Sequence, residues 1–207
     1  EELELTRHSL ELIDAYGCGV TIATKSGLIV RDIDILTSIQ SHSPVICKIT
    51  VTTADDALAA KIEPHAPAPS RRLAALEKLA GAGLFAGVLL MPVLPFLEDS
   101  EESVLAVVEG AARAGAKFIY PAFGVTMRQG QREYFLDGLE RAFPGRRLKE
   151  RYLRQYGDRY QCASPRARTL WRVFTGACQE RGILYDMKSI IRAATLGYGD
   201  RQLTFFD

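Results

Sequence analysis

Hydrophobic and polar positions along the first 124 residues predict helices and strands in turn. Apolar residues at helical spacing indicate helices, and short β-branched runs indicate strands buried on both faces. The predicted order is helix 5–16, strand 19–24, helix 32–40, strand 45–51, helices 56–63 and 69–81, strand 85–91, helix 99–114 and strand 117–123. Alternation of this kind predicts an α/β fold with a parallel sheet.

The pattern changes after Gly124. Four segments have apolar residues at helical spacing: 134–143, 147–156, 165–181 and 187–196. We therefore divide the chain into a partial (β/α) barrel core over residues 1–124, a helical C-terminal portion over 125–198 and a tail over 199–207.

The composition is that of a soluble globular protein. The 207 residues are 47% hydrophobic and 25% charged, which is enough for one sizeable core. A net charge of +1 gives no overall attraction to nucleic acid or to membranes. We find no signal peptide and no apolar run of about 18 residues, so we expect a cytoplasmic protein. The sequence opens in a helix without an initiator Met, which suggests that it was cut from something longer or processed.

The four cysteines are Cys18, Cys47, Cys162 and Cys178. No two of them have the CxxC or CxxxC spacing of a local zinc or iron–sulfur motif. We expect Cys47 and Cys178 to be buried, as free cysteines usually are. No metal-binding residue is predicted in this sequence.

Polar side chains gather where two predicted strands end. Lys25 follows strand 19–24, and strand 45–51 gives way to the hydroxyls of Thr50, Thr52 and Thr53. Parallel α/β folds bind ligands at the carboxyl edge of the sheet, so we expect these side chains to face a site. Thr53 could equally act as the N-cap of the next helix.

Charged residues lie around the next helices. Glu63 with Arg71 and Arg72 could be a site carboxylate and an anion clamp. We favour a structural ion pair between Glu63 and Arg72 that supports the loop. His65 has no visible partner for metal binding or acid–base catalysis.

Several motifs resemble, in order, those of one protein family. They are Thr24-Lys25-Ser26, Thr50-Val51-Thr52-Thr53, segments 61–73 and 82–88, and Met91-Pro92-Val93-Leu94-Pro95. Together they resemble the barrel motifs of the spore photoproduct lyase-like radical S-adenosylmethionine proteins. The resemblance covers residues 5–97 and the end of the tail, and is loose over 98–200.

The resemblance implies a partial (β/α) barrel of the radical S-adenosylmethionine type. In that family a 4Fe-4S cluster on a CxxxCxxC loop cleaves S-adenosylmethionine to a 5′-deoxyadenosyl radical. This sequence contains no such loop. The implied function is therefore the C-terminal part of such an enzyme, whose cluster is bound by an absent N-terminal segment and whose implied substrate is DNA or a nucleotide.

The resemblance also implies the cofactor-binding residues. Lys25 would pair with the carboxylate of S-adenosylmethionine by a charge-assisted hydrogen bond. Thr50, where the family usually has serine, and Thr52 would bond its carboxylate or ribose. Val93 would pack against its adenine. No catalytic residue is assigned, and Lys25 could instead be a solvated lysine or the Schiff-base lysine of an aldolase-like barrel.

One loop departs from the family pattern. The family commonly has Gly-Leu-Asn-Asp where this sequence has Phe96-Leu97-Glu98-Asp99. Glycine adopts positive φ angles without steric cost, and phenylalanine does not. We therefore expect the loop at Phe96 to have a different geometry.

Two further features suggest macromolecular partners. Arginine and aromatic residues interleaved over 128–172 could bind nucleic acid by phosphate contacts and stacking, although we favour a solvated helical cap. The tail Gln202–Phe206 resembles the bacterial sliding-clamp-binding peptide, and could dock on a clamp or on this protein's own barrel. The alternative function is a cluster-less interaction protein that binds nucleic acid or a sliding clamp.

Overall fold

The computed structural model describes residues 4–199. Its helices are α1 (Leu5–Ala15), η1 (a 3-10 helix, Gly27–Asp32), α2 (Ile33–Gln40), α3 (Asp56–Ile62), α4 (Pro69–Gly81), α5 (Glu101–Arg113), α6 (Gln131–Ala142), α7 (Leu148–Tyr156), α8 (Ala167–Glu180) and α9 (Met187–Thr195). Its strands are β1 (Val20–Thr24), β2 (Val45–Thr50), β3 (Ala86–Leu90), β4 (Phe118–Pro121), β5 (Gly124–Thr126) and β6 (Gln161–Ala163). The tail Gln202–Phe206 lies outside the described residues.

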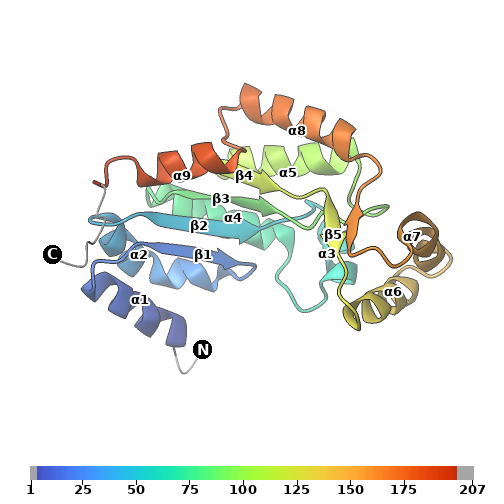
Figure 1. Cartoon of the computed structure of the whole chain (residues 1–207). Coiled ribbons are helices and arrows are strands. Elements are labelled where there is room, and N and C mark those ends of the chain that lie inside the picture. The colour runs from blue at the N-terminus through green and yellow to red at the C-terminus, as the bar shows by residue number, and fades with distance from the viewer. Residues whose placement is uncertain (1–3, 200–207) are drawn as a thin grey trace, which may run out of the picture.

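The predicted parallel sheet is confirmed. Its order is β1-β2-β3-β4, and each neighbouring pair is parallel. Figure 1 shows α2, α4 and α5 behind the strands, and α3, α6 and α7 beyond their carboxyl ends. This is the α/β arrangement expected of a partial barrel, in which the helices cover one face of the sheet.

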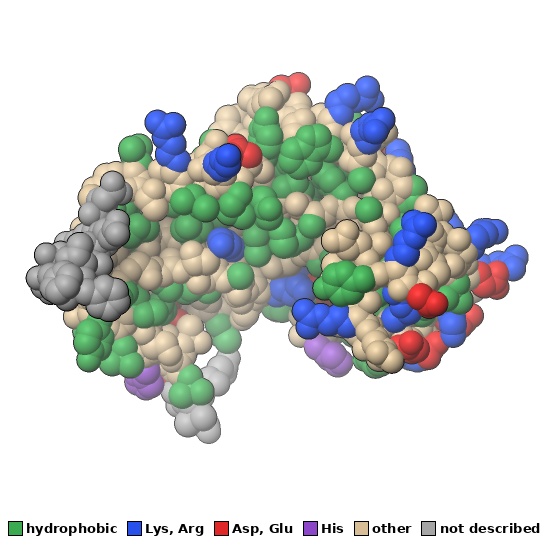
Figure 2. Space-filling view, in the orientation of Figure 1, with side chains coloured by type: hydrophobic (Ala, Val, Ile, Leu, Met, Phe, Trp, Pro, Cys, Tyr) green, Lys and Arg blue, Asp and Glu red, His purple; other side chains and the backbone are tan. Residues whose placement is uncertain are grey.

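The two faces of the sheet differ in burial. Along β2, Cys47 and Ile49 are fully buried against the helices, whereas Lys48 and Thr50 are half-buried. The prediction that these strands are buried on both faces is therefore wrong, because no helix layer covers the second face of β1 and β2 in residues 4–199. We call this second face the open face, and Figure 2 shows hydrophobic side chains over the strands on this side.

The C-terminal portion forms two different kinds of contact. Helix α8 packs on α5, and its residues Leu170 and Phe174 belong to the main core. Helices α6 and α7 pack on each other over a second core that runs from Met127 to Cys162. Strands β5 and β6, which the sequence pattern did not predict, pair antiparallel beside this second core. The proposed boundary at residue 124 falls where β5 begins.

The expectation that Phe96 avoids a positive φ is wrong. Its φ is 68°, in the left-handed region. The Phe96 N–H donates to Asp99 Oδ1 at 2.7 Å, and the ring packs edge-on against Tyr152 with centroids 5.3 Å apart. The Arg151 guanidinium lies 4.3 Å from the ring centroid. These contacts offset a backbone strain of about 1–2 kcal/mol.

Within residues 4–199, no helix is both long enough and apolar enough to cross a membrane.

Candidate functional site

Glu63, just after α3, connects the ends of two strands. Lys25 Nζ lies 2.7 Å from Glu63 Oε1. Arg72 Nη2 donates to Glu63 Oε2 at 2.6 Å, which confirms the predicted ion pair. Arg72 also donates from Nη1 to the Thr50 carbonyl (3.1 Å) and from Nε to the Pro67 carbonyl (2.6 Å). One buried arginine therefore joins the end of β2 to the loop between α3 and α4.

The charges around Glu63 favour its ionised form. Burial acts to raise the pKa of Glu63, but hydrogen bonds from Lys25 and Arg72 outweigh burial and hold this pKa below its usual value. The Lys25 side chain stays 41% exposed. An ammonium has three N–H donors, so Lys25 can bond Glu63 and still donate to an anionic ligand.

The three threonines predicted to face a site have different roles. Thr50 lies on the open face of β2 and is half-buried. Thr52 is buried, and its hydroxyl donates to Glu98 Oε1 at 2.6 Å. Thr53 Oγ1 accepts from the Asp55 N–H, whereas the N-cap of α3 is Asp55 itself. The suggestion that Thr53 caps this helix is therefore wrong.

Glu98 is a buried acid that the sequence did not single out. It is 0% exposed, and its Oε2 accepts from the Leu94 N–H at 2.9 Å. Burial is the main cause that raises the pKa of Glu98 to about 7, against the opposing effect of the hydrogen bonds from Thr52 and Leu94. Glu98 thus joins the segment after β2 to the segment after β3.

The raised pKa of Glu98 predicts a contribution to stability that is lost as pH rises. Between the ordinary value of 4.5 and about 7, the folded protein holds a proton on Glu98 that the unfolded chain has released. The contribution of Glu98 to stability is therefore fully present below about pH 4.5 and is lost through this window, by about 3 kcal/mol in total. Urea unfolding at several pH values measures this loss. The side chain in the Glu98→Gln variant cannot ionise, so the variant should not show this loss of stability between pH 4.5 and 7. An unchanged pH profile in that variant would contradict the assignment of the loss to Glu98.

The structure places Val93 in the main core. Its side chain is 0% exposed, and its N–H donates to the Ala122 carbonyl at 2.9 Å. Lys25 and Thr50 thus reach the carboxyl edge of the sheet with half-exposed side chains, whereas Thr52 and Val93 are buried.

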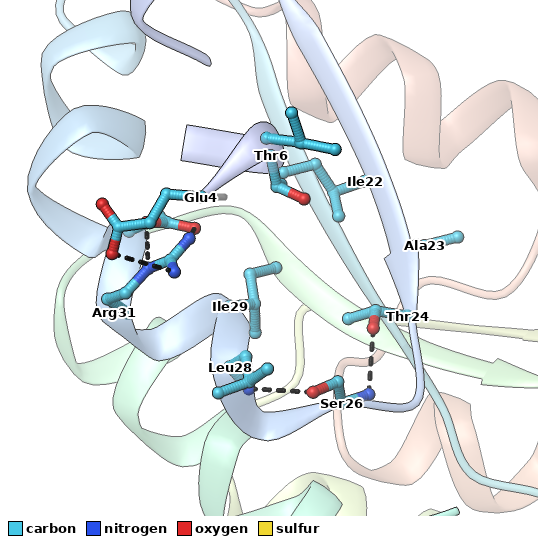
Figure 3. Close-up of a pocket in the computed structure, with 11 residues that line it drawn as sticks. Glu4, Thr6, Ile22, Ala23, Thr24, Ser26, Leu28, Ile29 and Arg31 are labelled. Atoms are coloured by element: carbon cyan, nitrogen blue, oxygen red, sulfur yellow. Dashed lines mark hydrogen bonds and ion pairs between the residues drawn. The ribbon is translucent and has the colours of Figure 1, made fainter. Parts of the chain in front are cut away.

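Two pockets open near this edge. One, of about 700 Å³, lies where β3 and β4 end and is lined by residues that include Met91, Phe123 and Arg128. The other, of about 810 Å³, lies along the outer side of β1 (Figure 3). There the Ser26 N–H donates to Thr24 Oγ1 at 2.9 Å, and the Ser26 hydroxyl accepts from the Leu28 N–H.

Basic residues in and next to α6 and α7 have acidic neighbours. Figure 2 shows Lys and Arg side chains mixed with Asp and Glu at this end of the molecule. Lys149 Nζ lies 2.7 Å from Asp137 Oδ1, and Arg147 pairs with Glu150. This mixture is typical of a solvated helical surface, the interpretation that we favoured from the sequence.

No protein-family model matches this sequence. An uncharacterized protein of Mycobacterium tuberculosis (strain ATCC 25618 / H37Rv) is 33% identical over 142 residues, which are 69% of this chain and 41% of that protein. An uncharacterized protein of Acidianus two-tailed virus is 30% identical over 118 residues, which cover 56% of this chain and 38% of that protein. The chain therefore spans about two-fifths of the length of these relatives.

Solved structures of spore photoproduct lyase resemble this chain in fold. A single-site variant of that enzyme superposes with a TM-score of 0.59 at 18% identity, covering 87% of this chain and 54% of that chain. Its complex with dinucleoside spore photoproduct gives 0.58 at 19% identity, with the same coverage. A variant with bound AdoMet and dinucleoside spore photoproduct gives 0.56 at 18%. Residues 4–199 thus have the fold of about half of spore photoproduct lyase.

Proposed function

We propose that this chain forms the cofactor-binding part of a radical S-adenosylmethionine enzyme related to spore photoproduct lyase. One observation carries the proposal: Lys25 and Thr50 lie at the carboxyl ends of two neighbouring parallel strands and are linked through Glu63 and Arg72, in a fold that resembles that of spore photoproduct lyase. Ligands of parallel α/β folds bind at this edge.

The donor chemistry of this edge suits S-adenosylmethionine. Lys25 would bind the carboxylate of the cofactor, and Thr50 would donate a hydroxyl hydrogen bond. The loop that carries Thr52 would form part of the cofactor-binding site. Val93 would belong to the buried apolar layer beneath the adenine. With a reduced 4Fe-4S cluster, the bound cofactor would supply radical chemistry.

The proposal places the cluster ligands outside the described residues. Within residues 4–199, no group of three or more His, Cys, Asp or Glu side chains could hold a metal ion. The residues of this chain would then bind and orient the cofactor. Protein beyond this sequence would bind the iron.

The substrate that we propose is DNA or a nucleotide. Support comes from a solved structure with this fold, which is of spore photoproduct lyase complexed with dinucleoside spore photoproduct. The pocket at the ends of β3 and β4 lies at the same edge of the sheet as Lys25, and Arg128 is one of its lining residues. A guanidinium in that position would bind a phosphate group.

Activity of the full-length gene product tests the proposal. After anaerobic reconstitution with iron and sulfide and reduction with dithionite, the protein should release 5′-deoxyadenosine from S-adenosylmethionine. Lys25→Ala should lower kcat/KM for this release by about 10- to 100-fold, because a hydrogen bond to a charged group is lost. Lys78→Ala, on the exposed side of α4, is the matched control and should match the parent. A full-length product that binds no cluster, or a Lys25→Ala variant as active as the parent, would refute the proposal.

A further inference from the structure

Glu98 and Thr52 form a buried hydrogen bond whose direction depends on one proton. The carboxyl group of Glu98 has no exposed surface, and its two oxygens form hydrogen bonds with the Thr52 hydroxyl at 2.6 Å and with the Leu94 N–H at 2.9 Å. A carboxylate accepts both hydrogen bonds without change. The ionised form of Glu98 therefore accepts both hydrogen bonds, and the oxygen positions would be the same if the hydrogen bond with Thr52 ran the other way.

Protonation would change only one of these two bonds. The Leu94 N–H is a fixed backbone donor, so Glu98 Oε2 must stay an acceptor. The added proton then resides on Oε1, which faces the Thr52 oxygen. Because Thr52 Oγ1 would accept that proton's hydrogen bond, the hydrogen of the Thr52 hydroxyl must turn away from Glu98.

We propose that Glu98 is a positioning residue whose protonation reverses its hydrogen bond with Thr52 and frees the Thr52 hydroxyl hydrogen for another acceptor at the carboxyl edge. Thr52 thus changes between a donor committed to Glu98 and a donor available to a ligand. The consequence for cofactor binding rests on the proposed function, whereas the reversal itself depends only on this chain.

Glu63, Lys25, Tyr152 and Asp99 are the ionisable groups around Glu98. Glu63 raises the pKa of Glu98 and Lys25 lowers it, and these two groups form an ion pair with each other. Tyr152, from α7, has its own pKa raised well above the usual range by burial, so its phenol stays neutral. Asp99, on the same loop, accepts from the Phe96 N–H and the Ser164 hydroxyl. Burial raises the pKa of Glu98 to about 7, so Glu98 itself can change charge there.

Infrared difference spectroscopy of the ligand-free chain tests the reversal. A carbonyl band of a protonated carboxyl group should disappear with a midpoint near pH 7, and Glu98→Gln should lack this band. Thr52→Val should raise the midpoint by about one pH unit, because the hydrogen bond that the ionised form loses is stronger than the one that the protonated form loses. Thr53→Val is the matched control, since its hydroxyl bonds the Asp55 N–H, and should leave the midpoint unchanged.

Two results would overturn the inference. One is the absence of any carboxyl band in this range that Glu98→Gln removes. The other is a Thr52→Val variant with the same midpoint as the parent. The Thr52→Val measurement remains decisive if Glu98→Gln fails to fold.

Binding of S-adenosylmethionine separates this inference from the proposed function. Its affinity should change across the midpoint in the parent and be constant with pH in Thr52→Val. Constant affinity in the parent would overturn the coupling of Thr52 to the cofactor. A protein that binds no S-adenosylmethionine at any pH would refute the proposed function, while the infrared titration would still decide the reversal.

Discussion

Arg72→Met should lower the free energy of unfolding by about 3–5 kcal/mol, the range expected when one partner of a buried, hydrogen-bonded ion pair is removed. The arginine is 1% exposed and donates to the Glu63 carboxylate and to two backbone carbonyls, those of Thr50 and Pro67. Methionine fills a similar volume but leaves both buried carbonyls without this donor. Urea or thermal unfolding measures the change.

Arg71→Met provides the matched control one residue earlier in α4. Arg71 is exposed, so its replacement should change stability by less than about 0.5 kcal/mol. If Arg72→Met costs no more than Arg71→Met, the contacts of Arg72 with Glu63 and the end of β2 do not stabilise the fold. The scaffold that we assign to the candidate site would then be wrong.

Gly87→Ala should destabilise the protein by about 3 kcal/mol or more, beyond the usual cost of overpacking a core. Gly87 pairs with Phe118 across β3 and β4. A Cβ at this position would lie 2.3 Å from the Phe118 carbonyl oxygen and 2.6 Å from Cδ1 of its ring. The backbone oxygen cannot move without shifting β4, so the two strands must separate. Chemical denaturation gives the loss.

Gly176→Ala is the contrasting change. A Cβ at Gly176 meets nothing within 4 Å, and the residue lies inside α8. Alanine favours a helix over glycine by about 1 kcal/mol, so this variant should be as stable as the parent or more stable. Equal effects at Gly87 and Gly176 would show that the packing of β3 against β4 at Phe118 is not as close as described.

The parallel core could be predicted from the sequence because its signals are local. The run Val45–Val51 is β-branched and apolar, and it forms β2 at Val45–Thr50. Pro69 marks the start of α4, which ends at Gly81 as predicted. The ends of the predicted strands placed Lys25 and Thr50 at the carboxyl edge of the sheet, as the structure does.

Strand β6 could not be predicted, because three residues are too few to show a period of two. Gln161–Ala163 pairs with β5, which lies far from it in the sequence. The burial of the strands was overestimated for a related reason. An apolar run does not show whether a second layer of structure covers it.

The burial of Glu98 could not be predicted from the sequence, because its environment is formed largely by residues that are far from it along the chain. Glu98 and Thr52 are 46 residues apart, and only the folding of two strand-end loops against each other brings them together. Next to Asp99 in a loop, Glu98 has the pattern of a solvated residue. The positive φ of Phe96 was missed because the contacts of its ring with Arg151 and Tyr152, which offset the strain, come from a distant helix.

Titration of the chain with S-adenosylmethionine, followed through its backbone amide resonances, tests most directly whether the carboxyl edge of the sheet binds this cofactor. Saturable shifts are expected at Lys25 and at Thr50–Thr53, and they should weaken in Lys25→Ala. Resonances at the opposite edge, around Gly19, should not move. Shifts confined to that opposite edge, or no saturable shift at Lys25 and Thr50, would contradict the account.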